Sequence, residues 1–222
     1  MHYRIGTRGS KLALVQSEYV KRRMEEAYPE DTFELVIIKT TGDKVTDKPL
    51  AAIGTKGLFV KEIEEALLSG SIDMAVHSMK DMPAECEAGL TFAKAWKRED
   101  CRDVLILKNA GSFSELPLGA VIGTGSLRRA CQLAMLRPDI QFTAIRGNVD
   151  TRINKLMDDS YGLDGIVLAA AGLNRLGRSS EITEYLDPEV VIPAPAQGVL
   201  AIETAAVLLL GRDDVIKDVA PA

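Results

Sequence analysis

The fold is decided by residues 192–203, which read Ile-Pro-Ala-Pro-Ala-Gln-Gly-Val-Leu-Ala-Ile-Glu. Pro193 and Pro195 force extended backbone and exclude helix, and the apolar run after Gly198 is typical of a strand. Because little chain follows this strand, we expect it to return to the sheet built by the first part of the sequence. A chain that leaves one domain, builds a second and then returns makes two crossovers, the connectivity of a hinge around a central cleft.

Upstream, apolar runs of strand length alternate with segments of helical apolar spacing, which indicates βαβ units and parallel sheets. The expected strands are residues 3–6, 33–39, 72–76, 104–107, 120–123, 141–145 and 165–169. In the helices between them, Cys131 and Met157 are expected on the buried face. The predicted fold class is α/β, with two domains of mixed, mostly parallel sheets and a double crossover, similar to type II periplasmic-binding-protein folds.

The domain boundaries are expected at a polar stretch, residues 97–103, and at the proline-rich stretch, residues 192–196. Domain 1 then contains residues 1–97 and 196–222, and domain 2 contains residues 98–195.

Composition excludes several classes of protein. The chain of 222 residues is 46% hydrophobic and carries a formal net charge of −5, which disfavours a nucleic-acid or membrane-surface partner. Its longest apolar stretches are too short to span a bilayer, and no leader opens the chain, so we expect a cytoplasmic protein. We also expect it to be a monomer. The three cysteines form no CxxC pair and no cluster with His2 or His77, so no metal site is predicted.

Four short basic turns stand out in this acidic chain, at residues 6–10, 77–81, 123–129 and 146–152. Each follows a strand-like run and precedes a helical segment, which places cations and backbone N–H groups at a helix N-terminus. Such turns predict a site for a ligand with several anionic groups.

Arginine is the main cation of these turns, and its planar fork suits bidentate contact with carboxylates. The candidate arginines exceed what one phosphate needs, so several carboxylates are the better ligand; they are Arg8, Arg128, Arg129, Arg146, Arg152 and Arg175. Arg128 and Arg129 point about 100° apart on a helix, so both reach one ligand only from an exposed first turn. The turn at Gly123 lacks the third glycine of a dinucleotide fingerprint, which disfavours a nucleotide.

Asp81 is an acid among these cations. A carboxylate here can hold N–H groups of a ligand or stabilise a developing positive charge, and it is our first candidate for chemistry. The alternative is that Asp81 only caps the turn before Pro83. For His77 and Phe59, structural roles are the simpler interpretation.

Six segments in this order resemble the porphobilinogen deaminase, or hydroxymethylbilane synthase, family. They are residues 7–14, 56–62, 77–83, 125–129, 146–152 and 171–177. The resemblance runs to about Glu203 and corresponds to the first two of the family's three domains. It implies head-to-tail condensation of four porphobilinogen molecules with release of ammonia, in tetrapyrrole and heme biosynthesis.

The resemblance also implies roles for single residues. Asp81 matches the catalytic aspartate, which holds pyrrole N–H groups and stabilises the azafulvenium-like cation left when ammonia departs. The matching substrate- and cofactor-binding positions are Arg8, Ser10, Lys56, Phe59, Ser78, Lys80, Thr124, Ser126, Arg128, Arg129, Arg146, Arg152, Arg175 and Gln197.

The resemblance fails at the C-terminus. The family attaches a dipyrromethane cofactor through a cysteine in a Gly-Gly-Cys loop of its third domain, and Cys86, Cys101 and Cys131 do not match that position. Residues 204–211 are also more apolar than the family pattern. We therefore expect a form without the third domain, weakly active or inactive alone. The alternative function is a non-catalytic two-domain binding protein for a polycarboxylate or another anion.

Overall fold

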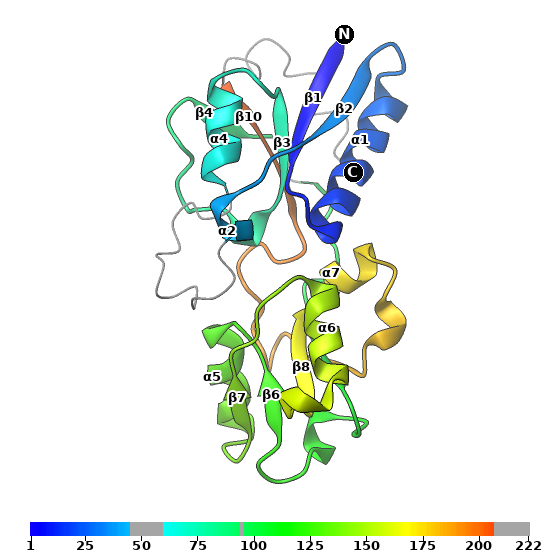
Figure 1. Ribbon diagram of the computed structural model, residues 1–222, viewed down its shortest axis with the longest axis vertical. Helices are drawn as coiled ribbons and strands as arrows, with labels where there is room; N and C mark the ends of the chain where they lie inside the picture. Colours follow the sequence, from blue (N-terminus) through cyan, green and yellow to red (C-terminus); the bar gives the residue numbers. More distant parts are fainter. Residues whose placement is uncertain (45–59, 94–95, 207–222) are drawn as a thin grey trace. The chain divides into compact units, whose positions relative to one another are not determined.

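The computed structural model describes residues 1–44, 60–93 and 96–206 of the chain. Two compact units are present (Figure 1). Unit 1 contains Met1–Arg98 and the described residues from Val199 onward, whereas unit 2 is the continuous segment Glu99–Gly198. The chain therefore passes from one unit to the other twice.

Unit 1 is built on a five-stranded sheet in the order β2-β1-β3-β10-β4. Its strands are β1 (His2–Thr7), β2 (Thr32–Ile37), β3 (Met74–Ser78), β4 (Leu90–Phe92) and β10 (Leu200–Ala205). β1 runs parallel to β2 and β3, and β10 pairs antiparallel with both β3 and β4. The predicted return of the chain to the first sheet is confirmed, because Ala201 of β10 lies opposite His77 of β3.

Helices cover both faces of this sheet. They are α1 (Lys11–Ala27), α2 (Thr41–Lys44) and α4 (Lys61–Leu68), and a 3-10 turn, η1 (Met79–Asp81), follows β3. Alternate residues of β3 point to opposite faces: Met74 joins the core under α1, and Ala75 joins the core under α4. Figure 1 shows α1 and α4 on opposite sides of the strands.

Unit 2 repeats this plan with the strand order β7-β6-β8-β5-β9. Its strands are β5 (Asp103–Leu107), β6 (Val121–Gly123), β7 (Gln141–Thr143), β8 (Gly165–Ala169) and β9 (Glu184–Tyr185). β6 is parallel to β7 and β8, whereas β5 is antiparallel to β8 and β9. Both sheets are thus mixed, as predicted, but parallel pairings form half of each sheet rather than most of it.

The helices of unit 2 are α5 (Leu127–Leu136), α6 (Val149–Met157) and α7 (Ala170–Arg175), with 3-10 turns η2 (Phe113–Glu115), η3 (Asp159–Tyr161) and η4 (Ser179–Glu181). Leu133 of α5 packs with Leu105 on one face of the sheet. Ile153 of α6 packs with Val104 and Ile106 on the other.

Two side chains that we expected to be buried are exposed. α5 buries Arg129 and Leu133, and Cys131 lies about 200° around the helix from both, so it faces outward. On α6 the buried residues are Ile153 and Leu156, and Met157 at the end of the helix is 56% exposed. The apolar spacing thus predicted both helices, but Cys131 lies on the opposite side of α5 from its buried residues, and on α6 only the last predicted inward residue, Met157, is wrong.

Candidate functional site

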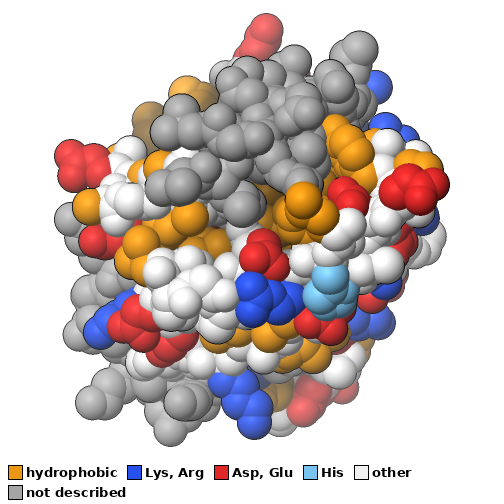
Figure 2. Space-filling view, turned by 90° about the horizontal axis from the view of Figure 1, so that it is seen from above, with side chains coloured by type: hydrophobic (Ala, Val, Ile, Leu, Met, Phe, Trp, Pro, Cys, Tyr) orange, Lys and Arg blue, Asp and Glu red, His pale blue; other side chains and the backbone are white. Residues whose placement is uncertain are grey.

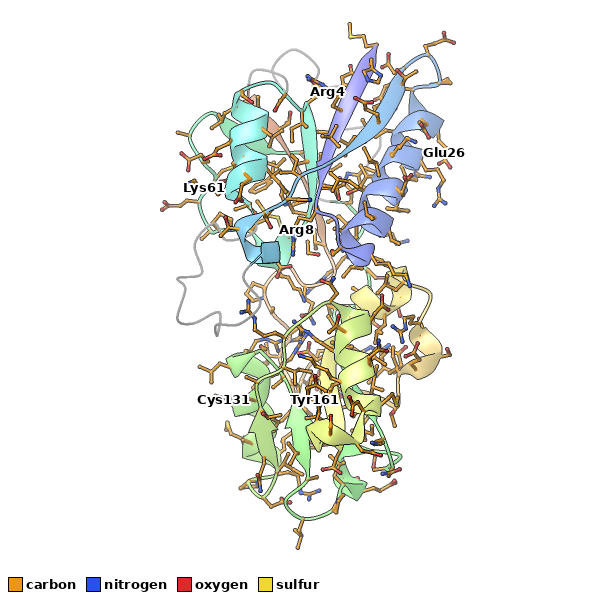
Figure 3. All side chains as sticks on the ribbon, viewed as in Figure 1. Arg4, Arg8, Glu26, Lys61, Cys131 and Tyr161 are labelled. Carbon is orange, nitrogen blue, oxygen red and sulfur yellow. The ribbon has the colours of Figure 1, made fainter. Side chains whose placement is uncertain are left out.

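In unit 1 the predicted site residues gather where β1 and β3 end. The two strands are parallel neighbours, with Ile5 opposite Met74, so their carboxyl ends lie at the same edge of the sheet. Arg8 and Ser10 follow β1, and Figure 3 labels Arg8 where this strand ends. Ser78, Lys80 and Asp81 belong to the end of β3 and to η1. One sheet edge therefore carries five of the predicted residues.

The turn after β1 is fixed by hydroxyl groups. Ser10 is the N-cap of α1, and its Oγ accepts a hydrogen bond from the backbone N–H of Ala13 at 3.3 Å. The buried Thr7 accepts a hydrogen bond from Ser17 Oγ at 2.7 Å. The start of α1 is thereby anchored to the end of β1.

The end of β3 is held from two directions. Gln16 of α1, which is 4% exposed, donates from Nε2 to Ser78 Oγ at 3.1 Å. The N–H of Met79 donates to Val199 O at 3.0 Å, just before β10. Lys80 and Asp81 are exposed, and no described residue donates a hydrogen bond to the Asp81 carboxylate. Its strand end is thus fixed while the carboxylate faces solvent.

A buried polar group that sequence reasoning missed lies beside this strand. Nε2 of His77 is 3.2 Å from Oε2 of Glu203, and neither residue is more than 7% exposed. The Sγ of Cys86 donates to the other oxygen of Glu203 at 3.7 Å. Burial, with the nearby Glu203 charge, raises the pKa of Cys86 to about 11. The structural role expected for His77 agrees with this position inside the sheet.

In unit 2 three basic segments share one sheet edge. β6, β7 and β8 are parallel neighbours, so the turns that follow them meet at their carboxyl ends. The turn after β6 carries Thr124, Ser126, Arg128 and Arg129; the turn after β7 leads to Arg146 and Arg152; α7 after β8 ends with Arg175. This edge carries five of the six arginines that the sequence predicted to bind carboxylates; the sixth, Arg8, belongs to unit 1.

Thr124 shapes the turn after β6. It is 5% exposed, its N–H donates to Thr143 O at 2.9 Å, and its Oγ1 accepts from the N–H of Ser126 at 3.1 Å. Ser126 occupies the N-cap position of α5, but its side chain makes no cap hydrogen bond. Thr124 therefore supports the turn from inside, while Ser126 stands at the helix N-terminus.

The turn after β7 requires a glycine. Gly147 has φ +116°, and a Cβ there would lie 2.7 Å from Thr151 Cγ2. This tight backbone lets Arg152 Nε donate to Gly147 O at 2.8 Å, and Lys155 Nζ donate to Arg146 O at 3.2 Å. The side chains of Arg152 and Lys155 are thus tied to the backbone of this turn.

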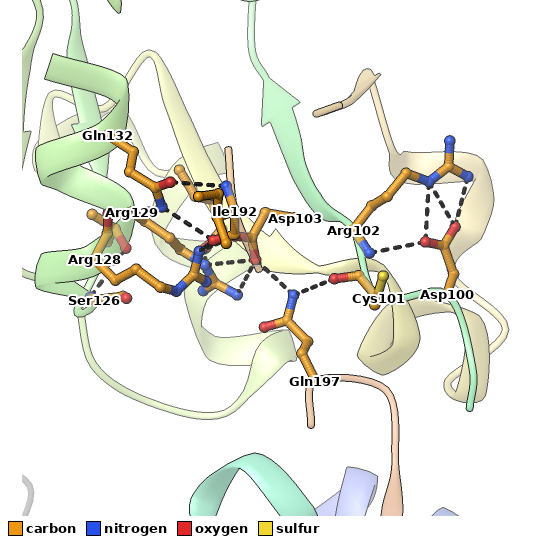
Figure 4. Close-up of polar contacts among 12 residues, drawn as sticks. Asp100, Cys101, Arg102, Asp103, Ser126, Arg128, Arg129, Gln132, Ile192 and Gln197 are labelled. Carbon is orange, nitrogen blue, oxygen red and sulfur yellow. Dashed lines mark hydrogen bonds and ion pairs between the residues drawn. The ribbon is translucent and has the colours of Figure 1, made fainter. Parts of the chain in front are cut away.

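Arg128 and Arg129 meet at a buried acid, Asp103, which is 0% exposed (Figure 4). Arg129 donates from Nε to Asp103 Oδ1 at 2.9 Å, and Arg128 Nη1 forms an ion pair with Oδ2 at 2.7 Å. Gln197, 1% exposed, donates from Nε2 to the same Oδ1 at 2.9 Å and to Cys101 O at 2.7 Å. Burial alone would raise the pKa of Asp103, but these three partners hold it below its ordinary value.

Asp103 itself was not among the predicted site residues. The sequence held one signal for it, an acidic side chain that opens an otherwise apolar strand in the same unit as two consecutive arginines. Arg175, which was predicted, donates from Nη2 to Gly198 O at 2.6 Å. Lys56 and Phe59 lie outside the described residues. The expectation that the basic turns of both units face a common cleft stays a prediction.

Other kinds of site find no support in the described part of the chain. There, no three His, Cys, Asp or Glu side chains are grouped to bind a metal ion, and no helix has the length and apolarity to cross a bilayer. On the face that Figure 2 shows, Lys and Arg side chains lie among Asp and Glu rather than in a patch of one sign.

The fold defines the general class of the protein. The chain is similar to the periplasmic VFT2 domain of BvgS from Bordetella pertussis, with a TM-score of 0.55 and 15% identity over 99% of this chain and 86% of that one. It is also similar to the methionine binding protein MetQ, with a TM-score of 0.54 and 13% identity over 99% and 88%. These likenesses show a two-unit α/β fold like that of type II periplasmic binding proteins.

The sequence comparisons are more specific. Residues 3–207 match the family described as porphobilinogen deaminase, dipyromethane cofactor binding domain. The chain is 98% identical over 207 residues to the porphobilinogen deaminase of Lachnospira eligens, covering 93% of this chain and 70% of the relative. Its identity to those of Syntrophus aciditrophicus and Clostridioides difficile is 54% and 55%. The chain belongs to the porphobilinogen deaminase family, and it spans 65 to 70% of the length of these three relatives.

Proposed function

We propose that this chain forms the substrate- and cofactor-binding part of a porphobilinogen deaminase, a transferase that condenses four porphobilinogen molecules and releases ammonia at each step. The observation that carries the proposal is the family match over residues 3–207. The positions of the basic turns support it, because each unit has them at the carboxyl ends of parallel strands.

Porphobilinogen is a single pyrrole ring with two carboxylates. A chain of such pyrroles therefore needs many cationic partners. Guanidinium groups bind carboxylates through two parallel hydrogen bonds, and backbone N–H groups at helix N-termini add further donors. The proposed binding residues in unit 2 are Thr124, Ser126, Arg128, Arg129, Arg146, Arg152, Arg175 and Gln197, and those in unit 1 are Arg8, Ser10, Ser78 and Lys80. Lys56 and Phe59 stay in the proposal on the resemblance alone.

The donor set of unit 2 fits a dipyrromethane, whose two rings also carry carboxylates. Arg128 and Arg129 at the N-terminus of α5 and Arg146 after β7 are the residues we propose to hold it. When bound, a dipyrromethane supplies the primer to which pyrrole units are added. The chain's own residues bind and orient carboxylates, and no cysteine of this chain is assigned to the attachment.

Asp81 is the proposed catalytic residue. Its carboxylate is exposed at the end of a strand that Gln16 and Val199 hold in place. A fixed negative charge here accepts hydrogen bonds from pyrrole N–H groups and stabilises the positive charge that develops as ammonia leaves. This role favours an enzyme over the alternative, a binding protein that only captures an anion.

The test is an assay of ammonia release from porphobilinogen. Two proteins are compared. One is the chain alone, and the other joins residues 1–203 to the part of the Lachnospira eligens relative that follows the position matching Glu203. We expect the extended protein to be active, and Asp81→Asn to lower its kcat by about a hundredfold or more, because one group that stabilises developing charge is lost.

The matched control is Glu85→Gln, which removes another exposed acid four residues further along and should leave kcat unchanged. An extended protein without activity would contradict the proposed function. Full activity in Asp81→Asn would remove Asp81 from the mechanism without affecting the family assignment.

A further inference from the structure

The position of Asp103 is unusual for an acid. It is the first residue of β5, it is 0% exposed, and it lies opposite Ala169 of β8 in the interior of the unit 2 sheet. A buried carboxylate destabilises a protein unless cations and hydrogen-bond donors surround it. Its partners must therefore keep their places for the unit to stay folded.

Both oxygens of this carboxylate have partners. Oδ1 accepts from Arg129 Nε at 2.9 Å and lies 2.7 Å from Arg129 Nη2, while Arg128 Nη1 pairs with Oδ2 at 2.7 Å. Arg128 Nη1 also donates to Ile192 O at 2.5 Å, and Arg129 Nη1 donates to Val167 O at 3.3 Å. Each guanidinium is thus fixed by a carboxylate and a backbone carbonyl.

This arrangement solves a geometric problem. Consecutive residues of a helix point about 100° apart, so Arg128 and Arg129 would ordinarily diverge. Asp103 brings both guanidinium groups to one carboxylate beside the N-terminus of α5, as Figure 4 shows. Gln197 joins the same oxygen from a segment 94 residues away in sequence.

We propose that Asp103 is a positioning residue, which holds Arg128, Arg129 and Gln197 in one arrangement at the sheet edge so that Arg128, the most exposed of the three, presents its remaining N–H donors to a ligand carboxylate. This inference rests on the proposed function. Asp103 touches no ligand and acts through the two arginines. Arg128, whose side chain is 26% exposed, is the outer member of the pair, and Arg129, at 8%, is the inner one.

The proposal makes a prediction whose sign differs from that of simple electrostatics. Asp103→Asn removes one negative charge from beside two arginines. If Asp103 did not position the arginines, this substitution would strengthen the binding of an anion. A positioning role predicts the reverse, because the arginines lose the group that orients them. We expect the Kd for porphobilinogen, measured by calorimetry on the 222-residue chain, to rise by about tenfold or more.

The matched control is Asp139→Asn. Asp139 also pairs with an arginine, Arg137, at 2.6 Å, and it follows the other end of α5. This variant removes the same charge from the same unit and should leave the Kd within about twofold of wild type. If Asp103→Asn does not fold, Asp103→Glu keeps the charge but moves the carboxylate by one methylene, and the same weakening is expected.

A second measurement needs no ligand. The Nε–H of Arg129, followed by nitrogen-15 NMR and assigned by its loss in Arg129→Lys, should exchange slowly in wild type and at least about tenfold faster in Asp103→Asn, because its acceptor loses its charge. Unchanged exchange, or porphobilinogen binding as tight as in wild type, would overturn the proposal. A wild-type chain that binds no porphobilinogen would contradict the proposed function, and the Nε–H exchange alone would then decide on Asp103.

Discussion

At the residue scale, the described part of each unit contains one fully buried acid with basic or donor partners. Asp103 in unit 2 holds two arginines, and Glu203 in unit 1 lies between His77 and Cys86. Both acids belong to strands, so their positions are fixed by the sheets rather than by loops. Removing one partner of such a group leaves a buried polar atom unsatisfied, which is costly.

The thiol of Cys86 should be unreactive, because its burial and the nearby Glu203 carboxylate disfavour the thiolate. With its pKa raised to about 11, only about one thousandth of it is thiolate at pH 8, against about a quarter for an ordinary thiol. We expect alkylation by iodoacetamide at pH 8 to be about two orders of magnitude slower than for free cysteine, and to accelerate about tenfold per pH unit from pH 7 to 9.5.

The measurement uses single-cysteine variants, followed by mass spectrometry. One keeps Cys86, and its control keeps Cys131, which is exposed on α5 (Figure 3) and should react readily. Equal rates for the two proteins would show that burial and the Glu203 charge do not keep the Cys86 thiol protonated.

At the element scale, α5 combines a structural face with a functional end. Leu133 is 0% exposed in the core under the helix, while Arg128 and Arg129 occupy its first turn. The packing of Leu133 fixes where α5 lies on the sheet. The position of α5 in turn fixes where the backbones of Arg128 and Arg129 lie. Packing under α5 and carboxylate binding at its N-terminus are therefore linked.

Leu133→Ala should destabilise unit 2 by about 2–5 kcal/mol, since it removes a large side chain from a closed core. Urea unfolding followed by circular dichroism measures this change. Met135→Ala on the same helix is the control, because Met135 is 82% exposed and its truncation should change the free energy of unfolding by less than about 0.5 kcal/mol. A similar loss in both variants would mean that the face assigned to α5 is wrong.

The elements that the sequence predicted well are those with a local signal. Apolar runs such as residues 104–107 and 165–169 coincide with buried strands, and Gly198 precedes the return strand as expected. The basic turns were also visible, because turn residues and arginines stand close together in sequence. β9, of two residues, has no periodicity to detect. Asp103 was missed because its role depends on partners distant in sequence: Arg129 lies 26 residues away and Gln197 lies 94 residues away.

At the scale of the whole molecule, the two units differ in how the chain builds them. Unit 2 is one continuous segment, Glu99–Gly198, with its own sheet and two cores. Unit 1 needs β10, which follows that segment in the sequence and lies between β3 and β4 in the sheet. Only unit 2 is therefore complete within a continuous stretch of sequence.

Residues 99–198 expressed alone should consequently fold and unfold cooperatively in urea, because this stretch contains every strand of its sheet. Residues 1–98 are the control. Without β10, the described part of that fragment leaves β4 with no neighbouring strand, so we expect no cooperative transition. A folded 1–98 fragment, or an unfolded 99–198 fragment, would show that the units depend on one another in another way.

The late arrival of β10 also affects how the protein emerges during synthesis. Residues 200–205 are translated more than 100 residues after Arg98, a delay of about 5–20 s at ordinary bacterial elongation rates. Until β10 appears, the N-terminal sheet has an open edge at β3, whereas every strand of unit 2, up to β9 at Glu184–Tyr185, has already been translated. The usual order of vectorial folding is thus inverted, and nascent-chain chaperones would find their binding surface on the part of the protein that is made first.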